Sequence, residues 1–267
     1  MSLANPAFHA PLEEVSALGW LSEVRTLADV ARMSVAMCFS RTARAARPQP
    51  VMVLPGFGGD DWWTWPLRRT LAAAGHRAEG WGLGRNLAGV DIPHSEDDIR
   101  RHWHVERLSH YRGEGCVILL CERLLTRVRR RHAELGEPLA LVGWSLGGYL
   151  AREVAREAPE CVSRVVTLGS PVVGGPKYTL AASFFRERGM NLDWIEQEVA
   201  KREARPIDVP ITAIVSGTDG VVHPPATVDL VNARVRHVEI DAPHLGLVFN
   251  PQVWALILDA LYTVPER

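Results

Sequence analysis

The stretch PLALVGWSLGG, residues 138–148, carries the pattern that decides the fold. Its first half is a short apolar run typical of a buried strand, and its second half has the form G-x-S-x-G. A sharp turn strains the backbone at its tip, so small neighbours are needed to let the Ser145 hydroxyl stand clear. Because a lone G-x-S-x-G also occurs in ordinary turns, the flanking pattern carries the argument. It predicts a strand, a tight turn carrying the serine, and a helix that begins near residue 147.

Two downstream residues have the positions that partners of this serine require. A nucleophilic serine needs a base, and the base needs a group that orients it. Asp219 follows the apolar run at residues 209–215, and His244 follows the run at residues 235–240. In a parallel α/β sheet the loops after the strands collect on one side, where ligands bind. We therefore expect Ser145, Asp219 and His244 to meet, in the chain order serine, acid, histidine.

Other assignments are open for the acid and the base. Asp219 also fits an ordinary Asp-Gly turn. Asp241 is a rival acid, but it lies only three residues before His244. His223 is too close to Asp219 in sequence to be a base on a separate loop. The remaining rivals for the base precede the serine, which is the wrong order: His94, His102, His104 and His110.

A glycine-rich segment near the start of the chain predicts the site for the negative charge that develops during acyl transfer. The apolar run at residues 51–54 is followed by PGFGG, residues 55–59. Such a loop exposes backbone N–H groups, which stabilise an oxyanion. We expect one donor to be the N–H of Phe57 and the other the N–H of Leu146, the residue after the serine. The alternative is a plain glycine-rich turn.

With these segments, the chain resembles an α/β-hydrolase of the bacterial esterase/lipase type. The matching segments are residues 55–59, 143–148, 217–222 and 243–246, within residues 49–262, and residues 80–87 resemble a segment of uncharacterised bacterial members. The resemblance implies carboxylic-ester hydrolysis through an acyl-serine intermediate. Two positions depart from the pattern, because Pro55 stands where many members have His, and Val172 where many lipases have His.

Strands and helices alternate from residue 51 onward, which predicts an α/β fold: a mainly parallel central sheet with helices on both faces. We divide the chain into an N-terminal helical segment, residues 1–48, and an α/β-hydrolase domain, residues 49–267. Residues 172–207 are too long for a simple crossover and contain several aromatic residues. They are expected to form a small helical cap over the site, or else a packed crossover helix.

The N-terminal segment has apolar residues at three-residue steps, which fit one helical face: Val15, Leu18, Leu21, Val24, Leu27, Val30 and Met33. That face could pack on the body of the protein, or it could lie on a membrane surface with nearby arginines at the headgroups.

Four aromatic residues are candidates for the substrate pocket: Trp62, Trp144, Phe184 and Trp194. The tryptophans near residue 62 could instead pack the following helix.

Composition narrows the classes of function. The net charge of −1 offers no basic field for nucleic acid. We expect no metal, since His102-Trp103-His104 lacks a third ligand, and no cofactor, since residues 80–84 have the wrong spacing for a dinucleotide fingerprint. Four scattered cysteines and the lack of a secretory or membrane-spanning pattern favour a cytoplasmic protein. The resemblance implies a small-molecule ester as the substrate. The same triad also fits an acyltransferase, thioesterase, lactonase or amidase, and the fold also fits a non-catalytic binding protein. The patterns do not predict the oligomeric state.

Overall fold

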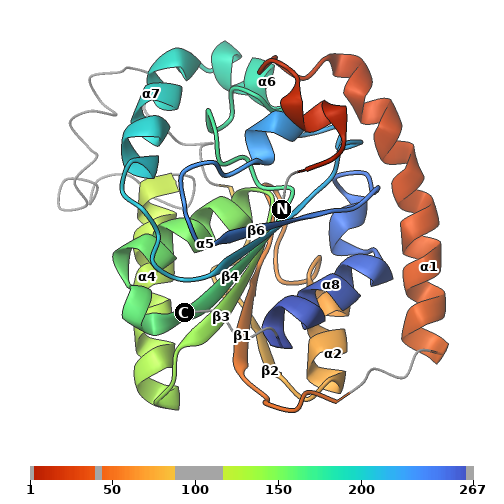
Figure 1. Ribbon diagram of the computed structural model, residues 1–267, viewed down its shortest axis with the longest axis vertical. Helices are drawn as coiled ribbons and strands as arrows, with labels where there is room; N and C mark the ends of the chain where they lie inside the picture. The colour runs from red at the N-terminus through yellow and green to blue at the C-terminus, as the bar shows by residue number, and fades with distance from the viewer. Residues whose placement is uncertain (1–2, 40–43, 88–116, 263–267) are drawn as a thin grey trace.

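A computed structural model describes residues 3–39, 44–87 and 117–262 of the chain (Figure 1). Six parallel strands of the described residues form one sheet, in the order β2-β1-β3-β4-β5-β6. In chain order the strands are β1 (Pro50–Leu54), β2 (Arg77–Gly80), β3 (Leu139–Trp144), β4 (Val162–Leu168), β5 (Ile211–Val215) and β6 (Val235–Glu239). The predicted parallel α/β fold is confirmed.

Helices cover both faces of the sheet (Figure 1). One face carries α4 (Val117–Leu135) and α5 (Leu146–Glu157), and the other carries α2 (Trp65–Ala73) and α8 (Pro251–Tyr262). Alternate residues of a strand point to opposite faces. Met52 and Leu54 of β1 accordingly pack with α4 and α5, while Val51 and Val53 pack with α2 and α8. Burial on both faces explains why the central strands read as continuous apolar runs.

The order of the strands reverses between β1 and β3. The chain goes from β1 out to the edge strand β2 and then returns to the other side of β1 as β3. In open parallel sheets the crevice at such a reversal, beyond the carboxyl ends of the strands, is where ligands bind. The loop at residues 55–59 and the turn at Ser145 are the two segments that leave β1 and β3 at this point.

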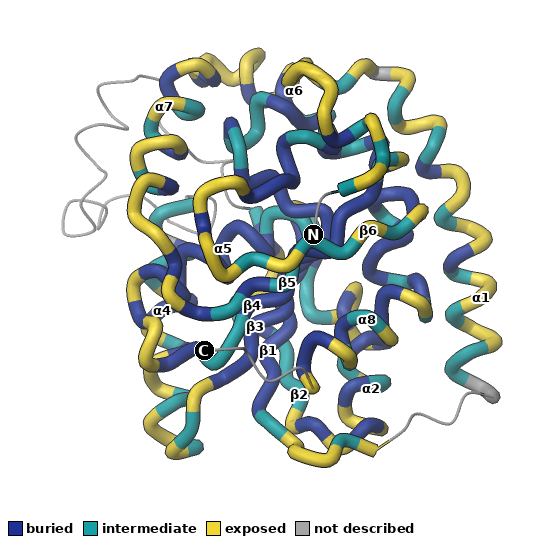
Figure 2. The backbone as a smooth tube through the Cα atoms, in the orientation of Figure 1, coloured by how far each residue is buried: buried dark blue, intermediate teal, exposed yellow. Residues whose placement is uncertain are grey.

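The N-terminal segment leaves the first part of its predicted apolar face exposed and packs the last part on the body. It contains a 3-10 helix, η2 (Ala17–Arg25), and α1 (Thr26–Phe39). Leu18 is 72% exposed and Leu27 is 73% exposed, whereas Glu23 and Asp29 are buried at 8% and 2%. Figure 2 shows exposed and intermediate residues alternating along α1. The expectation that the apolar face packs on the body is wrong from Leu18 to Leu27, whereas Met33, on the same predicted face, packs against the core. Because a 3-10 helix has three residues per turn, Leu18, Leu21 and Val24 lie on one side of η2, and this side faces outward.

Two helices lie between β4 and β5, above the carboxyl ends of the strands (Figure 1). The shorter, α6 (Ala182–Glu187), packs its buried side chains into a small cluster with Met190 and Leu192. The longer, α7 (Leu192–Glu203), places Val199 in the main core against α4 and α5. This segment is thus continuous with the core at α7 and has a cluster of its own at α6.

Candidate active site

Ser145 stands on a strained turn between β3 and α5. Its φ is 54°, and it is the only non-glycine residue with a positive φ among the residues that the structure describes. The surrounding glycines are required by close backbone contacts. A Cβ on Gly143 would lie 2.4 Å from the carbonyl oxygen of Gly147, and a Cβ on Gly147 would lie 2.6 Å from that of Leu54. Strain at one residue of an otherwise regular sheet indicates a functional position.

Asp219 and His244 meet in the interior. Asp219 Oδ2 lies 2.6 Å from His244 Nδ1, and the two side chains are almost fully buried. The other oxygen of Asp219 accepts the backbone N–H groups of Val221 and Val222, at 2.9 and 2.7 Å. These bonds leave the carboxylate with one orientation. Gly169, at φ 52°, passes close to both side chains, since a Cβ there would lie 2.9 Å from Asp219 Oδ2.

Asp241, the rival for the acid, points elsewhere. Its carboxylate is 69% exposed, pairs with Arg25 at 3.0 Å, and accepts a hydrogen bond from the Thr218 hydroxyl at 2.7 Å. Of the two candidate acids, Asp219 is therefore the one that contacts His244.

The surroundings of His244 favour its charged form. Burial lowers the pKa of the imidazole, but the charge of Asp219 and its hydrogen bond oppose this, with a further contribution from Glu23. The net result is a pKa above the ordinary value for histidine. A carboxylate that orients the ring and stabilises its charged form is the partner that a general base needs.

Trp144 connects the serine turn to the histidine loop. Its indole N–H donates a hydrogen bond to the carbonyl oxygen of His244 at 3.1 Å, and the centroids of the two rings are 5.8 Å apart. Trp63 stacks on the outer side of Trp144 at 6.2 Å. The serine that follows Trp144 is thereby held at the same edge as the histidine. Among the described residues, no hydrogen bond joins Ser145 Oγ to His244.

The loop at residues 55–59 is braced by Asn86, which is fully buried. The Asn86 side-chain amide donates to the carbonyl oxygen of Pro55 at 2.8 Å. The backbone of Asn86 also exchanges two hydrogen bonds with the loop, accepting from Gly58 N–H and donating to Gly59 O, at 2.7 Å each. This leaves Phe57 at the tip of the loop. Leu146 is the first residue of α5, where a backbone N–H has no partner within the helix.

Asp61 binds the backbone of the segment that follows β2. Its two oxygens accept the backbone N–H groups of Trp81 and Gly82 at 2.9 and 3.0 Å, and a Cβ on Gly80 would lie 2.2 Å from Oδ1. Gly80 therefore lets the chain pass close to Asp61. The roles of Asn86 and Asp61 were not predicted, because the only signal was the resemblance of residues 80–87 to other bacterial proteins.

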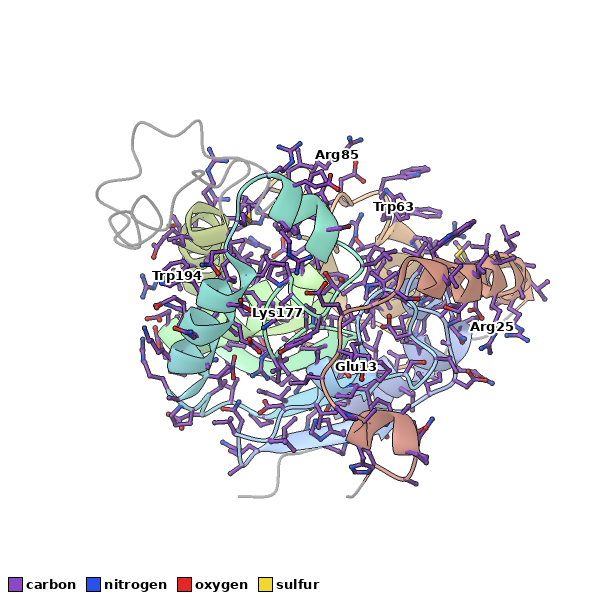
Figure 3. All side chains as sticks on the ribbon, turned by 90° about the horizontal axis from the view of Figure 1, so that it is seen from above. Glu13, Arg25, Trp63, Arg85, Lys177 and Trp194 are labelled. Atoms are coloured by element: carbon purple, nitrogen blue, oxygen red, sulfur yellow. The ribbon has the colours of Figure 1, made fainter. Side chains whose placement is uncertain are left out.

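The four aromatic candidates for the substrate pocket have different surroundings. Trp62 is 76% exposed and stacks on Trp65, whereas Trp144 and Trp194 are buried. Phe184, on α6, is 37% exposed, and its ring lies 6.4 Å from that of Phe57. Figure 3 shows Trp63 and Trp194 on opposite sides of α6. The contact between Phe57 and Phe184 brings α6 onto the loop at residues 55–59, while the pocket assignment itself stays a prediction.

Two further observations concern metals and membranes. In the described ranges, no group of three or more His, Cys, Asp or Glu side chains is arranged to hold a metal ion. The motif His102-Trp103-His104 lies outside these ranges. No described helix combines the length and the hydropathy needed to cross a bilayer.

Comparisons with known proteins agree with the fold. No family model matches the chain. The chain is 28% identical over 179 residues to the pimeloyl-acyl-carrier protein methyl ester esterase of Klebsiella pneumoniae, covering 59% of this chain and 68% of that one. It is 33% identical over 93 residues to the enzyme of the same name from Sodalis glossinidius, a match that spans 34% of each protein.

A solved structure, lipase B of Aspergillus fumigatus, superposes with a TM-score of 0.57 at 19% identity, covering 82% of this chain and 53% of that one. At this identity the likeness concerns the fold alone. The parallel sheet, the strained serine turn after β3 and these resemblances together place the chain in the α/β-hydrolase superfamily.

Proposed function

We propose that the protein hydrolyses carboxylic esters through an acyl intermediate on Ser145. The observation that carries this proposal is the buried 2.6 Å contact between Asp219 and His244, at the edge of the sheet where Ser145 occupies its strained turn. An oriented base that can reach a serine hydroxyl is the arrangement that nucleophilic catalysis requires.

The proposed reaction has two stages. His244 Nε2 takes the proton of Ser145 Oγ while this oxygen attacks the carbonyl carbon of the ester, and Asp219 stabilises the imidazolium that forms. The N–H groups of Phe57 and Leu146 bind the oxyanion, each lowering the barrier by about 3 kcal/mol. The alcohol leaves with the proton held by His244. Water then gives a proton to His244 and attacks the acyl carbon, and the proton returns to Ser145 as the acid is released.

The raised pKa of His244 predicts how activity depends on pH. The base must be neutral to accept a proton, so turnover rises as pH increases through the pKa of His244. Because Asp219 raises this pKa, the rising part of the profile should lie above that expected for an ordinary histidine.

The names of the curated relatives suggest the substrate. Both are named as pimeloyl-acyl-carrier protein methyl ester esterases. We infer that the chain acts on the ester of a small alcohol, and that Phe57 and Phe184 flank the acyl group where α6 meets the loop at residues 55–59. A series of methyl and p-nitrophenyl esters of increasing acyl length, with acid release followed by pH-stat, would define the preferred substrate.

Replacing the serine tests the mechanism. Ser145→Ala should abolish turnover of a p-nitrophenyl ester and labelling by a serine-directed phosphonate, without a change in melting temperature. Ser163→Ala is the matched control, because this serine lies near the amino-terminal end of β4, whereas Ser145 follows the carboxyl end of β3. Unchanged turnover in Ser145→Ala would exclude this residue as the nucleophile. Failure of the unaltered chain to react with the phosphonate would favour a non-catalytic binding protein.

A further inference from the structure

Glu23, in the N-terminal segment, contacts both loops that carry the acid and the base. One carboxylate oxygen accepts the backbone N–H of His244 at 2.9 Å and that of Gly220 at 3.1 Å, and the other accepts the N–H of Leu245 at 2.8 Å. The carboxylate is buried, with Glu23 8% exposed. A buried carboxylate that accepts several backbone N–H groups forms strong, charge-assisted bonds. It therefore links the loop after β5 to the loop after β6.

The backbone of η2 lies directly against the loop that follows Asp219. A Cβ on Gly220 would lie 2.1 Å from the carbonyl oxygen of Gly19 and 2.2 Å from Ser22 Oγ. A Cβ on Gly19 would in turn lie 2.7 Å from the carbonyl oxygen of Gly220. The two segments thus meet without intervening side chains. The position of the loop depends on the position of η2.

A second buried carboxylate holds the other end of the histidine loop. Asp29 Oδ1 accepts a hydrogen bond from the Asn250 side chain at 3.0 Å, and a Cβ on Gly246 would lie 2.3 Å from Asp29 Oδ2. Asp29 and Glu23 therefore contact the loop on both sides of Leu245. Burial of an unpaired charge is costly. Asp29 pairs with Arg32 at 3.2 Å, whereas Glu23 has no ion pair in the part of the chain that the structure describes, so its burial needs a specific reason.

We propose that Glu23 is a positioning residue, which fixes the main chain of His244 against the Asp219 loop and so makes the N-terminal segment part of the site. The catalytic meaning of this role rests on the proposed function. Glu23 contacts backbone N–H groups, so it acts on the reaction through His244. Its charge has a second effect. Asp219 and Glu23 are the two carboxylates that raise the pKa of His244, and removal of either charge should lower that pKa.

The test is Glu23→Gln, which keeps the shape and removes the charge. We expect kcat for a p-nitrophenyl ester to fall between about tenfold and about a hundredfold, the range for a small misplacement of a catalytic group. The rising part of the pH profile should move to lower pH. The matched control is Glu14→Gln, on the same segment, because the Glu14 carboxylate pairs with Arg186 at the surface. The control should change neither quantity.

A purely structural role of Glu23 would give a different result. Stability would fall, while the folded protein would keep its kcat and its pH profile, and this outcome would overturn the proposal. If Glu23→Gln does not fold, Glu23→Asp decides, because it keeps the charge with a shorter reach. We then expect a lower kcat with an unshifted profile, and an unchanged kcat would overturn the positioning role.

The proposed function can fail separately. A titration of His244 followed by NMR of the labelled imidazole needs no substrate, and we expect a lower pKa in Glu23→Gln than in the unaltered chain. If the unaltered chain hydrolyses no ester of the series, the proposed function fails, while a lowered pKa still supports the contact of Glu23 with this site. An unchanged pKa together with unchanged kcat overturns the inference about Glu23.

Discussion

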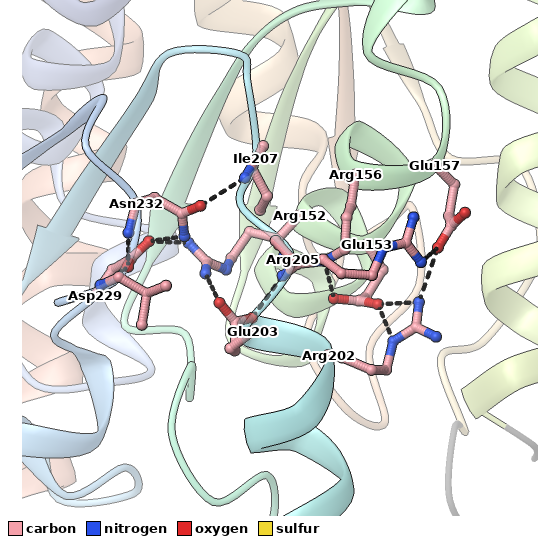
Figure 4. Close-up of polar contacts among 11 residues, drawn as sticks. Arg152, Glu153, Arg156, Glu157, Arg202, Glu203, Arg205, Ile207, Asp229 and Asn232 are labelled. Atoms are coloured by element: carbon pink, nitrogen blue, oxygen red, sulfur yellow. Dashed lines mark hydrogen bonds and ion pairs between the residues drawn. The ribbon is translucent and has the colours of Figure 1, made fainter.

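The N-terminal segment and α7 lie outside the central sheet, and buried charges fix both of them to the body, but the partners of those charges differ. On α7, Glu203 accepts hydrogen bonds from Arg152 and Arg156 of α5, at 2.6 and 2.8 Å, and Arg152 also pairs with Asp229 at 2.6 Å. On the N-terminal segment, Glu23 accepts only backbone N–H groups, and it has no ion pair among the described residues. Figure 4 shows the network around Arg152 and its connection to Arg202 and Glu157.

Because of this difference, the network of α7 should affect the stability of the fold, whereas Glu23 should affect the reaction. In the network of α7, guanidinium groups neutralise the carboxylates, so little field extends beyond it. The carboxylate of Glu23 lacks such a counter-ion, and its field reaches the imidazole of His244. We therefore expect changes around Arg152 to alter the free energy of unfolding, and changes at the contact of η2 to alter the reaction.

The largest effect on stability is expected for Arg152→Met. The substitution leaves Asp229 and Glu203 buried without their shared cation, and breaking a buried pair in this way costs about 3–5 kcal/mol. Urea unfolding measures this cost, and the kcat of the folded fraction should not change. The pKa of Asp229 is below its ordinary value, because the charge of Arg152 and hydrogen bonds from Asn232 outweigh the effect of burial. The stability that the charged Asp229 gives to the folded protein is present above the unfolded-state pKa of this residue, and it is lost as pH falls through the folded-state pKa.

The lowered pKa of Asp229 also predicts how the stability of this variant depends on pH. Acid should narrow the gap in stability between Arg152→Met and the unaltered chain, since a protonated Asp229 no longer needs the cation. The control is Arg205→Met, because Arg205 is 61% exposed and pairs with Glu157 at 3.1 Å. A surface pair contributes about 0–1 kcal/mol. Equal losses in the two variants would contradict the distinction between buried and exposed pairs, and a loss of kcat in Arg152→Met would contradict the separation of stability from chemistry.

Much of the fold was predictable from the sequence because its signals are local. Apolar runs followed by glycine-containing turns indicate strands and loops wherever they occur. The meeting of Asp219 and His244 followed from a general property of parallel sheets, since each residue comes after a strand and β5 lies beside β6. The strained turn at Ser145 followed from the glycines around it.

The residues that hold this site in place were not predictable in the same way. Glu23 bonds to the backbone of a residue 221 positions away, and Asn86 bonds to the backbone of Pro55. A backbone N–H or carbonyl carries no residue-specific signal, so no pattern in the sequence marks the partner. For the N-terminal segment, the apolar periodicity was itself misleading. One of its two interpretations put Leu18 and Leu27 on the packed face, whereas Glu23 is the buried side chain that contacts the loop.

A smaller effect is expected where η2 and the Asp219 loop meet. Gly220→Ala places a methyl group against the carbonyl oxygen of Gly19, and overpacking of this kind costs about 1–3 kcal/mol. The displaced loop carries Asp219, so kcat should fall with the melting temperature. Gly19→Ala crowds the same contact from the other side, because its methyl group would lie 2.7 Å from the carbonyl oxygen of Gly220. The double variant should therefore cost less than the sum of the single variants in a double-mutant cycle. Additive costs with an unchanged kcat would show that η2 can move without disturbing the site.

The smallest effect is expected for Arg25→Ala, two residues from Glu23 on the same segment. Arg25 also reaches the two loops, through Asp241 at 3.0 Å and Thr218 at 3.5 Å, but it is 49% exposed and Asp241 is 69% exposed. Water and salt screen such a pair, so the loss in the free energy of unfolding should be below about 1 kcal/mol and should disappear at high ionic strength. The pH profile of kcat should not move. A shift as large as that in Glu23→Gln would mean that any charge near these loops sets the pKa of His244, whether or not it is buried against the backbone.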